Sequence, residues 1–265
     1  MSYTQKLARA KEHFATLEAD LGRYIFDDKT YSVRPTQSSD RKKHSFFGTL
    51  HEEPPAEWGP LVGDTLHNLR CTLDHIVWEL ADPAMRGKHT MFPMFTCRDD
   101  FSRLVKKGAK KGQPAHGGGL YRLSGVAADP LAIIEAAQPY NWAGDSEHPG
   151  EALRILDKIE NIDKHRTLHT VGAFTAPEKS DIPIPDGETL SVTLFGGPLA
   201  VGKETEVLTL DFSFDPSGMK MEVDLSFTVL FTDTGVVDGT PIDATLSGLI
   251  SQVEAVTDDL KPYLP

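Results

Sequence analysis

The spacing of apolar residues changes along this chain of 265 residues, and that change limits the folds open to it. In four stretches, near residues 3–26, 60–81, 149–165 and 242–260, apolar residues recur every three or four positions, which is typical of amphipathic helices. Between residues 166 and 235 the period is two instead, which is typical of antiparallel strands with one buried face. We therefore expect an α+β protein in which a four-helix bundle core is combined with a mostly antiparallel β-sheet.

The expected helical and strand segments interleave along the sequence. The helical part is expected at about residues 1–27, 58–165 and 241–262, and the sheet part at about 28–52 and 166–235. No repeat is visible, and no linker is long or polar enough to force two independent domains. We predict a single α+β domain over residues 1–265.

The composition is that of an ordinary globular protein, with 39% hydrophobic and 25% charged residues. No apolar run approaches the roughly 20 residues of a membrane span, and the first residues do not form a signal-peptide core. We therefore expect a soluble, cytoplasmic protein with no membrane partner. Two cysteines are too few for a disulfide framework, which also favours a reducing compartment.

The net charge of −12 is unevenly distributed. Residues 178–265 contain 4 basic and 16 acidic side chains, which leaves 23 of each sign in residues 1–177. The first two thirds of the chain are thus neutral overall, so the global charge does not exclude an anionic partner there.

The helix expected at residues 60–81 separates two kinds of side chain. One half of its helical wheel is apolar and wide enough to face a core. The other half carries short polar groups and two imidazoles, where a solvated helix face would usually carry Lys, Glu and Gln. The polar residues are Asp64, His67, Asn68, Cys71, Asp74 and His75. This face is the best candidate for a site.

Four of these residues form a single row on the helix. Asp64, Asn68, Cys71 and His75 follow one another at spacings of four, three and four. Such a row could supply two or three ligands to a metal ion, with others from His165 or His169. The alternative is a buried polar layer in which the groups satisfy one another. No local zinc motif appears, so we assign no metal ligand and expect no cofactor.

Arg70 and His75 form an Arg-x4-His spacing in mid-helix. In this the chain resembles the HEPN superfamily of helical-bundle proteins, whose ribonuclease members carry an Arg-x4-6-His motif at a dimer cleft. The resemblance implies metal-independent RNA cleavage in a defence or toxin system, with His75 as the acid/base group and Arg70 as the phosphate clamp. The chain departs from that motif at Cys71, where Asn or Asp is common, and Arg70 and His75 differ by about 140° on an ideal wheel.

A second motif, Asn161-Ile162-Asp163-Lys164-His165-Arg166, ends the helix expected at residues 149–165. The pairing of Gly-Asp-x-x-His-Asn-Leu-Arg-x-x-Leu-Asp-His with this motif resembles an uncharacterised group of bacterial and phage-associated proteins, which carries no established activity. If the two helices pack side by side, the second motif completes a polar site. The expected catalytic residues are then His75, Arg70 and His165, and the expected substrate-binding residues are Asp64, His67, Asn68, Asp74, Asn161, Lys164 and Arg166. The alternative is that residues 164–166 only cap their helix.

A basic, glycine-rich segment lies between the two motifs. Its cations are Arg98, Arg103, Lys106, Lys107, Lys110 and Lys111, opposed by two aspartates, and five glycines follow within residues 108–119. Such a segment is suited to contact RNA phosphates or to close over a ligand, although a solvated loop is the simpler interpretation. Its glycines match no phosphate-binding or dinucleotide motif.

Two hypotheses for the function follow. The first is a HEPN-like protein, either a metal-independent endoribonuclease with RNA as its partner or a catalytically silent relative. The second is a non-enzymatic binding or structural protein in which the polar helix face only specifies packing. The long alternating strands near the C-terminus offer an edge to a second copy, so we expect a homodimer in either case.

Overall fold

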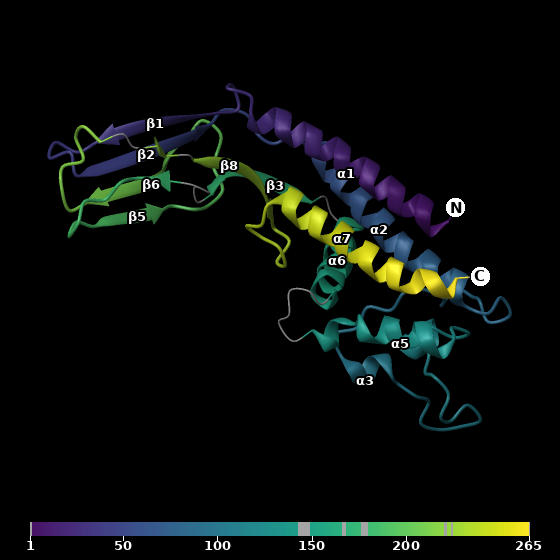
Figure 1. The fold of residues 1–265 in the computed structure, drawn as a ribbon. Coiled ribbons are helices and arrows are strands. Elements are labelled where there is room, and N and C mark those ends of the chain that lie inside the picture. The colour runs from purple at the N-terminus through teal and green to yellow at the C-terminus, as the bar shows by residue number, and fades with distance from the viewer. Residues whose placement is uncertain are drawn as a thin grey trace. The chain divides into compact units, whose positions relative to one another are not determined.

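The computed structural model describes residues 2–142, 149–165, 168–175, 180–219, 222–223 and 225–264 (Figure 1). The protein is α+β, as predicted. The helices are α1 (Tyr3–Ile25), α2 (Trp58–Leu80), α3 (Arg98–Phe101), α4 (Gly119–Arg122), α5 (Ala128–Ala136), α6 (Gly150–Asp163) and α7 (Ile242–Leu260). The strands are β1 (Tyr31–Gln37), β2 (Lys43–Leu50), β3 (His169–Thr175), β4 (Ser180–Asp181), β5 (Leu190–Leu194), β6 (Glu204–Phe212), β7 (Glu222–Val223) and β8 (Ser226–Thr232).

The chain forms two compact units. The helical unit comprises residues 1–17, 59–168 and 243–265, and the sheet unit comprises residues 18–58 and 169–242. In this division the last part of α1, residues 18–25, belongs to the sheet unit, whereas the helical part was predicted to extend to about residue 27. The single domain over residues 1–265 stays a prediction, and so does the four-helix bundle, because the helical unit also contains α3, α4 and α5.

Helix α2 supplies a large share of the core of the helical unit. Pro60 stands in its first turn, where a missing N–H group costs nothing, and the Arg86 side chain donates to the carbonyls of Glu79 and Ala81 at its other end. Its predicted apolar face is buried, except that Leu80 is half-buried. The fully buried residues are Val62, Leu66, Leu69, Leu73, Ile76 and Val77.

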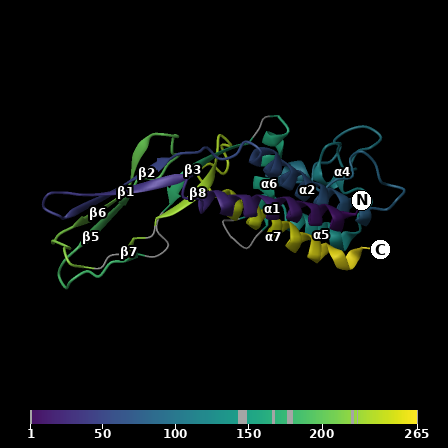
Figure 2. The ribbon, with the colours of Figure 1, turned by 90° about the horizontal axis from the view of Figure 1, so that it is seen from above.

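Helices α1 and α7 run in opposite directions in the helical unit. Both chain ends lie at the same end of this unit, which α1 leaves and α7 approaches (Figure 1 and Figure 2). Lys11 of α1 forms an ion pair with Glu254 of α7. Most of the apolar positions predicted for α7 are buried, including Leu246, Val253 and Leu260. None of the helices in the described ranges combines the length and apolar content needed to cross a bilayer.

The sheet unit contains an antiparallel sheet with the strand order β1-β2-β6-β5. Strands β1 and β2 form a hairpin within the sheet part predicted at residues 28–52, and they pair from Tyr31 opposite Leu50 to Gln37 opposite His44. A second antiparallel pair joins β3 to β8. The strand expected at residues 221–231 is described only in part, because residues 221 and 224 lie outside the described ranges.

Strand β6 is more deeply buried than its sequence pattern indicates. Leu208, Leu210 and Phe212 form the expected buried face, yet Val207 and Thr209 are buried as well. The Thr209 hydroxyl is within 3.1 Å of the Ser45 hydroxyl on β2. Because β6 lies between β2 and β5, both of its backbone edges are paired. The edges of this sheet are therefore β1 and β5.

Candidate functional site

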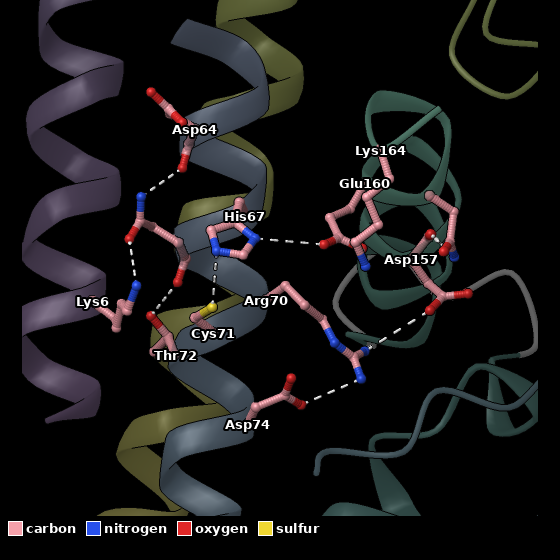
Figure 3. Close-up of polar contacts among 12 residues, drawn as sticks. Lys6, Asp64, His67, Arg70, Cys71, Thr72, Asp74, Asp157, Glu160 and Lys164 are labelled. Carbon is pink, nitrogen blue, oxygen red and sulfur yellow. Dashed lines mark hydrogen bonds and ion pairs between the residues drawn. The ribbon is translucent and has the colours of Figure 1, made fainter. Parts of the chain in front are cut away.

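Helices α2 and α6 pack antiparallel along a line of polar residues, which we call the α2–α6 seam (Figure 3). At one end the helices approach closely at Gly63, where an added Cβ atom would lie 2.5 Å from the Asp163 carboxylate. Residue numbers rise along α2 as they fall along α6. The facing pairs are Gly63 with Asp163, His67 with Glu160, and Arg70 with Asp157.

Arg70 is held by groups of its own chain. Its Nη2 donates to the Phe92 carbonyl at 2.7 Å and lies 3.3 Å from Asp74 Oδ1, while Nη1 lies 3.9 Å from Asp157 Oδ1. The Phe92 N–H in turn donates to Asp74 Oδ1 at 2.9 Å. The Arg70 side chain is only 12% exposed, and its buried Nη1 has no hydrogen-bond partner among the described residues. Arg70 thus links α2 to α6 and to the segment at Phe92.

Glu160 links three further polar groups of the seam. Its side chain is 5% exposed, and Lys164 Nζ lies 2.6 Å from its Oε2. On the other side, His67 Nδ1 lies 3.7 Å from Glu160 Oε1, and His67 Nε2 lies 3.4 Å from the Cys71 sulfur. The nearly buried carboxylate is therefore paired with an ammonium group and an imidazole, as a buried charge requires.

Burial in the seam raises the pKa of two titratable groups. Desolvation raises the pKa of the Asp163 carboxyl, and the nearby carboxylates of Asp64 and Glu160 raise it further, against a smaller opposing effect of His67. Desolvation also raises the pKa of the Cys71 thiol. A thiol held in its protonated form is a poor nucleophile, so Cys71 is suited to packing.

The predicted row on α2 does not converge on one point. Asn68 is 7% exposed, donates to the Asp64 carbonyl at 2.7 Å, and accepts from Lys6 Nζ of α1 at 3.4 Å. Lys6 and Glu160 lie on opposite sides of α2 in Figure 3. Asn68 therefore contacts α1, whereas Cys71 contacts His67 on the side of α6. Within the described ranges, no group of three or more His, Cys, Asp or Glu side chains is placed to hold a metal ion.

The remaining predicted site residues lie in different surroundings. His75 is half-buried on α2. His165 is exposed just beyond α6, where its backbone N–H donates to the Ile162 carbonyl at 3.0 Å. The Asn161 side chain is exposed and donates to the Asp157 carbonyl of its own helix at 2.6 Å. Arg166 lies outside the described residues. The structure thus brings together His67, Arg70, Asp74 and Lys164, and the functional roles assigned to all these residues stay predictions.

The sequence analysis missed the carboxylates that α6 contributes. Asp157, Glu160 and Asp163 follow one another at spacings of three, so they occupy one side of α6. Gly63, His67 and Arg70 on α2 have the similar spacings of four and three. This correspondence of spacings was the one sign in the sequence that the two helix faces could pair. The prediction used the apolar positions of residues 149–165 and the motif at residues 161–166, and neither shows which residues of another helix the three carboxylates meet.

Arg122 of α4 is a second arginine near the seam. Burial lowers the pKa of its guanidinium, the nearby Arg70 lowers it further, and Asp157 and Asp74 act in the opposite direction. Its guanidinium carbon lies 5.1 Å from the centroid of the Phe95 ring. The guanidinium groups of Arg70 and Arg122 thus both interact electrostatically with Asp74 and Asp157.

The basic segment forms a tight turn with exposed cations. Val105 donates to the Gln113 carbonyl at 2.9 Å, and Gly112 donates back to the Val105 carbonyl at 3.0 Å. Gly112 has a φ of +83°, which a residue with a side chain rarely adopts. The four lysines between residues 106 and 111 are exposed. Contact of this segment with RNA stays a prediction.

Comparison of the chain with protein-family models, with curated proteins and with solved structures gives no match. The HEPN assignment therefore depends on the spacing of Arg70 and His75 and stays a prediction. The chemistry of the α2–α6 seam must be judged from its own geometry.

Proposed function

We propose that this protein is a non-enzymatic binding or structural protein in which the polar face of α2 specifies how the helices pack. The observation that carries this proposal is that Arg70 is already paired within its own chain. Its guanidinium is engaged by the Phe92 carbonyl, Asp74 and Asp157. A phosphate group would have to compete with two carboxylates for this arginine.

The charge balance of the seam supports the same proposal. Besides the exposed Asp64, four carboxylates surround it, and the permanent cations beside them are two arginines and one lysine. The carboxylates are Asp74, Asp157, Glu160 and Asp163. A phosphodiester approaching this seam meets repulsion, whereas a site that cleaves RNA stabilises the additional negative charge of its transition state with cations.

A HEPN-like ribonuclease is the second candidate function, and one observation favours it. The buried Nη1 of Arg70 has no hydrogen-bond partner among the described residues. A buried donor without an acceptor is costly, and a phosphate oxygen would be a suitable acceptor. In that case His75 would act as the acid/base group for metal-independent cleavage of RNA.

An RNA cleavage assay in EDTA separates the two candidates. We expect RNA to stay intact with the wild type. We expect Arg70→Met to lower the free energy of unfolding by about 2–4 kcal/mol, because Asp74, Asp157 and the Phe92 carbonyl lose their partner. The matched control is Arg9→Met on α1, where the arginine is 59% exposed and pairs with an exposed Glu12. That change should cost about 0.5 kcal/mol or less in a urea titration.

The opposite pattern would favour the ribonuclease. RNA cleavage in EDTA by the wild type, abolished in His75→Ala while the melting temperature is unchanged, would overturn the packing proposal. A small effect of Arg70→Met on stability, equal to that of Arg9→Met, would also contradict it.

A further inference from the structure

A pocket in the helical unit shares Arg122 with the surroundings of the α2–α6 seam and takes its other lining residues from outside the seam. Its volume is about 420 Å³, within the range of pockets that bind small ligands. The walls come from a turn at residues 87–90, from a turn at residues 115–118 and from α4. The lining residues are Lys88, His89, Met91, His116, Gly117, Tyr121 and Arg122.

The pocket is cationic. Lys88 and Arg122 carry fixed positive charges, His89 and His116 are imidazoles, and none of the seven lining residues is acidic. The surrounding sequence, residues 83–123, contains nine basic residues and two acidic ones, in a chain whose net charge is −12. The positive potential of this segment should therefore favour an anionic ligand over a neutral or cationic one.

One wall of the pocket is aromatic. The Tyr121 ring lies 4.6 Å from the His89 ring and 5.0 Å from the His116 ring, measured between ring centroids. The rings are tilted by 41° and 47°, so each histidine packs against Tyr121 at an angle. Planar heterocycles stack on such rings regardless of their identity. A ligand that combines an anion with a planar ring fits this arrangement.

The lining residues are held in place by local hydrogen bonds. Gly87 donates to the Thr90 hydroxyl at 3.0 Å, and Thr90 donates back to the Gly87 carbonyl at 2.9 Å, which closes the first turn. Arg103 Nη2 donates to the His116 carbonyl at 2.9 Å and fixes the second turn. Such preorganisation lowers the entropy cost of binding.

Arg122 gives a further reason to expect an anion. Its guanidinium is half-buried and close enough to Arg70 for the two charges to repel. Asp74 and Asp157 offset this repulsion, but both carboxylates also form ion pairs with Arg70. A phosphate in the pocket would give Arg122 a counter-charge of its own.

We propose that this pocket binds a nucleotide, with Lys88 and Arg122 on the phosphate and the ring surface of Tyr121, His89 and His116 against the base. This site goes beyond the proposed function, because ribonuclease activity at the α2–α6 seam would neither require nor contradict it. A free nucleotide and the phosphorylated end of an RNA present the same chemistry.

The test is calorimetric titration of the full chain with adenosine 5′-monophosphate, adenosine and inorganic phosphate. We expect the monophosphate to bind, and adenosine to bind at least tenfold more weakly, because the phosphate contacts are lost. Lys88→Met should weaken binding of the monophosphate about tenfold, and Tyr121→Leu should weaken it by a similar factor. The control is Lys106→Met in the basic segment, which is exposed and does not line the pocket, and it should change affinity less than twofold.

The source of the phosphate is identified by two RNA probes, a ten-nucleotide strand with and without a 5′-phosphate. If the phosphorylated strand binds more tightly than the mononucleotide, the site is supported and its ligand is an RNA end. If the mononucleotide binds more tightly, the site is supported and its ligand is a free nucleotide. Three results would overturn the proposal: no binding of the monophosphate at millimolar concentration, equal binding of adenosine, or equal losses in Lys88→Met and Lys106→Met. Because Lys88 is exposed, its variant should melt at the wild-type temperature, so a loss of affinity there is not a loss of folding.

Discussion

The polar residues of α2 differ in how much water they meet, and this difference sets their chemistry. Arg70 and Asn68 are nearly buried and bonded to their own chain, whereas His67 is 56% exposed and Asp64 is exposed. A buried polar group loses its hydration and must find a partner in the protein. For this reason Arg70 and Asn68, which were predicted to belong to a site, are hydrogen-bonded within the protein, while His67 and Asp64 keep their contact with water.

The two cysteines offer a direct test of this view. Burial raises the pKa of the Cys71 thiol, while Cys97 is exposed. We expect Cys97 to react with a disulfide reagent at pH 8 at least tenfold faster than Cys71, because only the accessible thiolate attacks. The single-thiol variants Cys71→Ser and Cys97→Ser separate the two rates. Faster reaction of Cys71 would show an open, activated thiol and would contradict the packing role.

Asp163 should make the stability depend on pH. Its carboxyl has a raised pKa in the folded protein, so the folded state binds the proton more tightly than the unfolded state. Stability is then lost as the pH rises from about 3.9, the ordinary value for aspartate, through the raised pKa. Asp163→Asn has no carboxyl to ionise and does not lose this stability. The free energy of unfolding of the variant minus that of the wild type should therefore increase as the pH rises from 4 to 7.

Asp40 provides a control of opposite sign. Hydrogen bonds from the Ser38 hydroxyl and the Lys42 backbone lower the pKa of this carboxyl. Its ionised form therefore stabilises the folded state above the ordinary pKa of aspartate. Relative to the wild type, Asp40→Asn should become less stable as the pH rises. The same trend in both variants, measured by urea unfolding at each pH, would show that Asp163 is not destabilised by its surroundings.

The helices approach one another most closely where a glycine removes the side chain. At Gly63 the approach is to the Asp163 carboxylate, and at Gly119 it is to the buried ring of Phe101. A Cβ atom on Gly119 would lie 2.2 Å from a ring carbon of Phe101. Helices α3 and α4 therefore depend on this glycine, and α4 carries two residues that line the cationic pocket, Tyr121 and Arg122.

Substitution of glycine by alanine should have opposite effects in two helices. Gly119→Ala should lower the free energy of unfolding by about 1–3 kcal/mol, because the Phe101 ring has to move. Gly248→Ala on the exposed side of α7 meets no atom within 4 Å, and alanine favours a helix, so it should raise stability by about 0.5–1 kcal/mol. Thermal unfolding of both variants is the measurement, and equal effects would contradict the close packing of α4.

The helices and most strands were predictable, because each depends on a local period of apolar residues. The four long helices lie within a few residues of their predicted bounds, and β1 and β2 lie in the sheet part predicted at about residues 28–52. The burial of Val207 and Thr209 on β6 was not predicted, because the alternation of apolar and polar residues indicates only one buried face. Sequence periodicity indicates one buried face and carries no information about which strands become neighbours.

At the scale of the whole chain, the distribution of charge and the edges of the sheet determine which surfaces can bind a partner. The acidic excess lies in residues 178–265, while residues 83–123 are strongly basic. In the sheet unit, the edge strand β5 exposes Val192 by 54%. An edge with unpaired backbone groups and an exposed apolar side chain can add a strand from another chain.

We expect a homodimer, and β5 is the edge through which a second copy could pair. Light scattering should then give a mass of twice 29.1 kDa. Val192→Lys should shift the protein toward the monomer, because a charge on an edge strand opposes pairing. A monomer at all concentrations would contradict the homodimer, and an unchanged dimer in Val192→Lys would contradict pairing through β5.

Local pattern was enough to establish the α+β class, the bounds of the long helices and the two faces of α2. Periodicity carries this information because burial repeats with the helix turn or the strand pleat. The partners of Arg70, the pairing of Glu160 with Lys164 and His67, and the meeting of Lys88 with Arg122 in one pocket required the folded chain. These contacts join residues distant in sequence or on separate helices, and a close approach in space has no signature in local spacing.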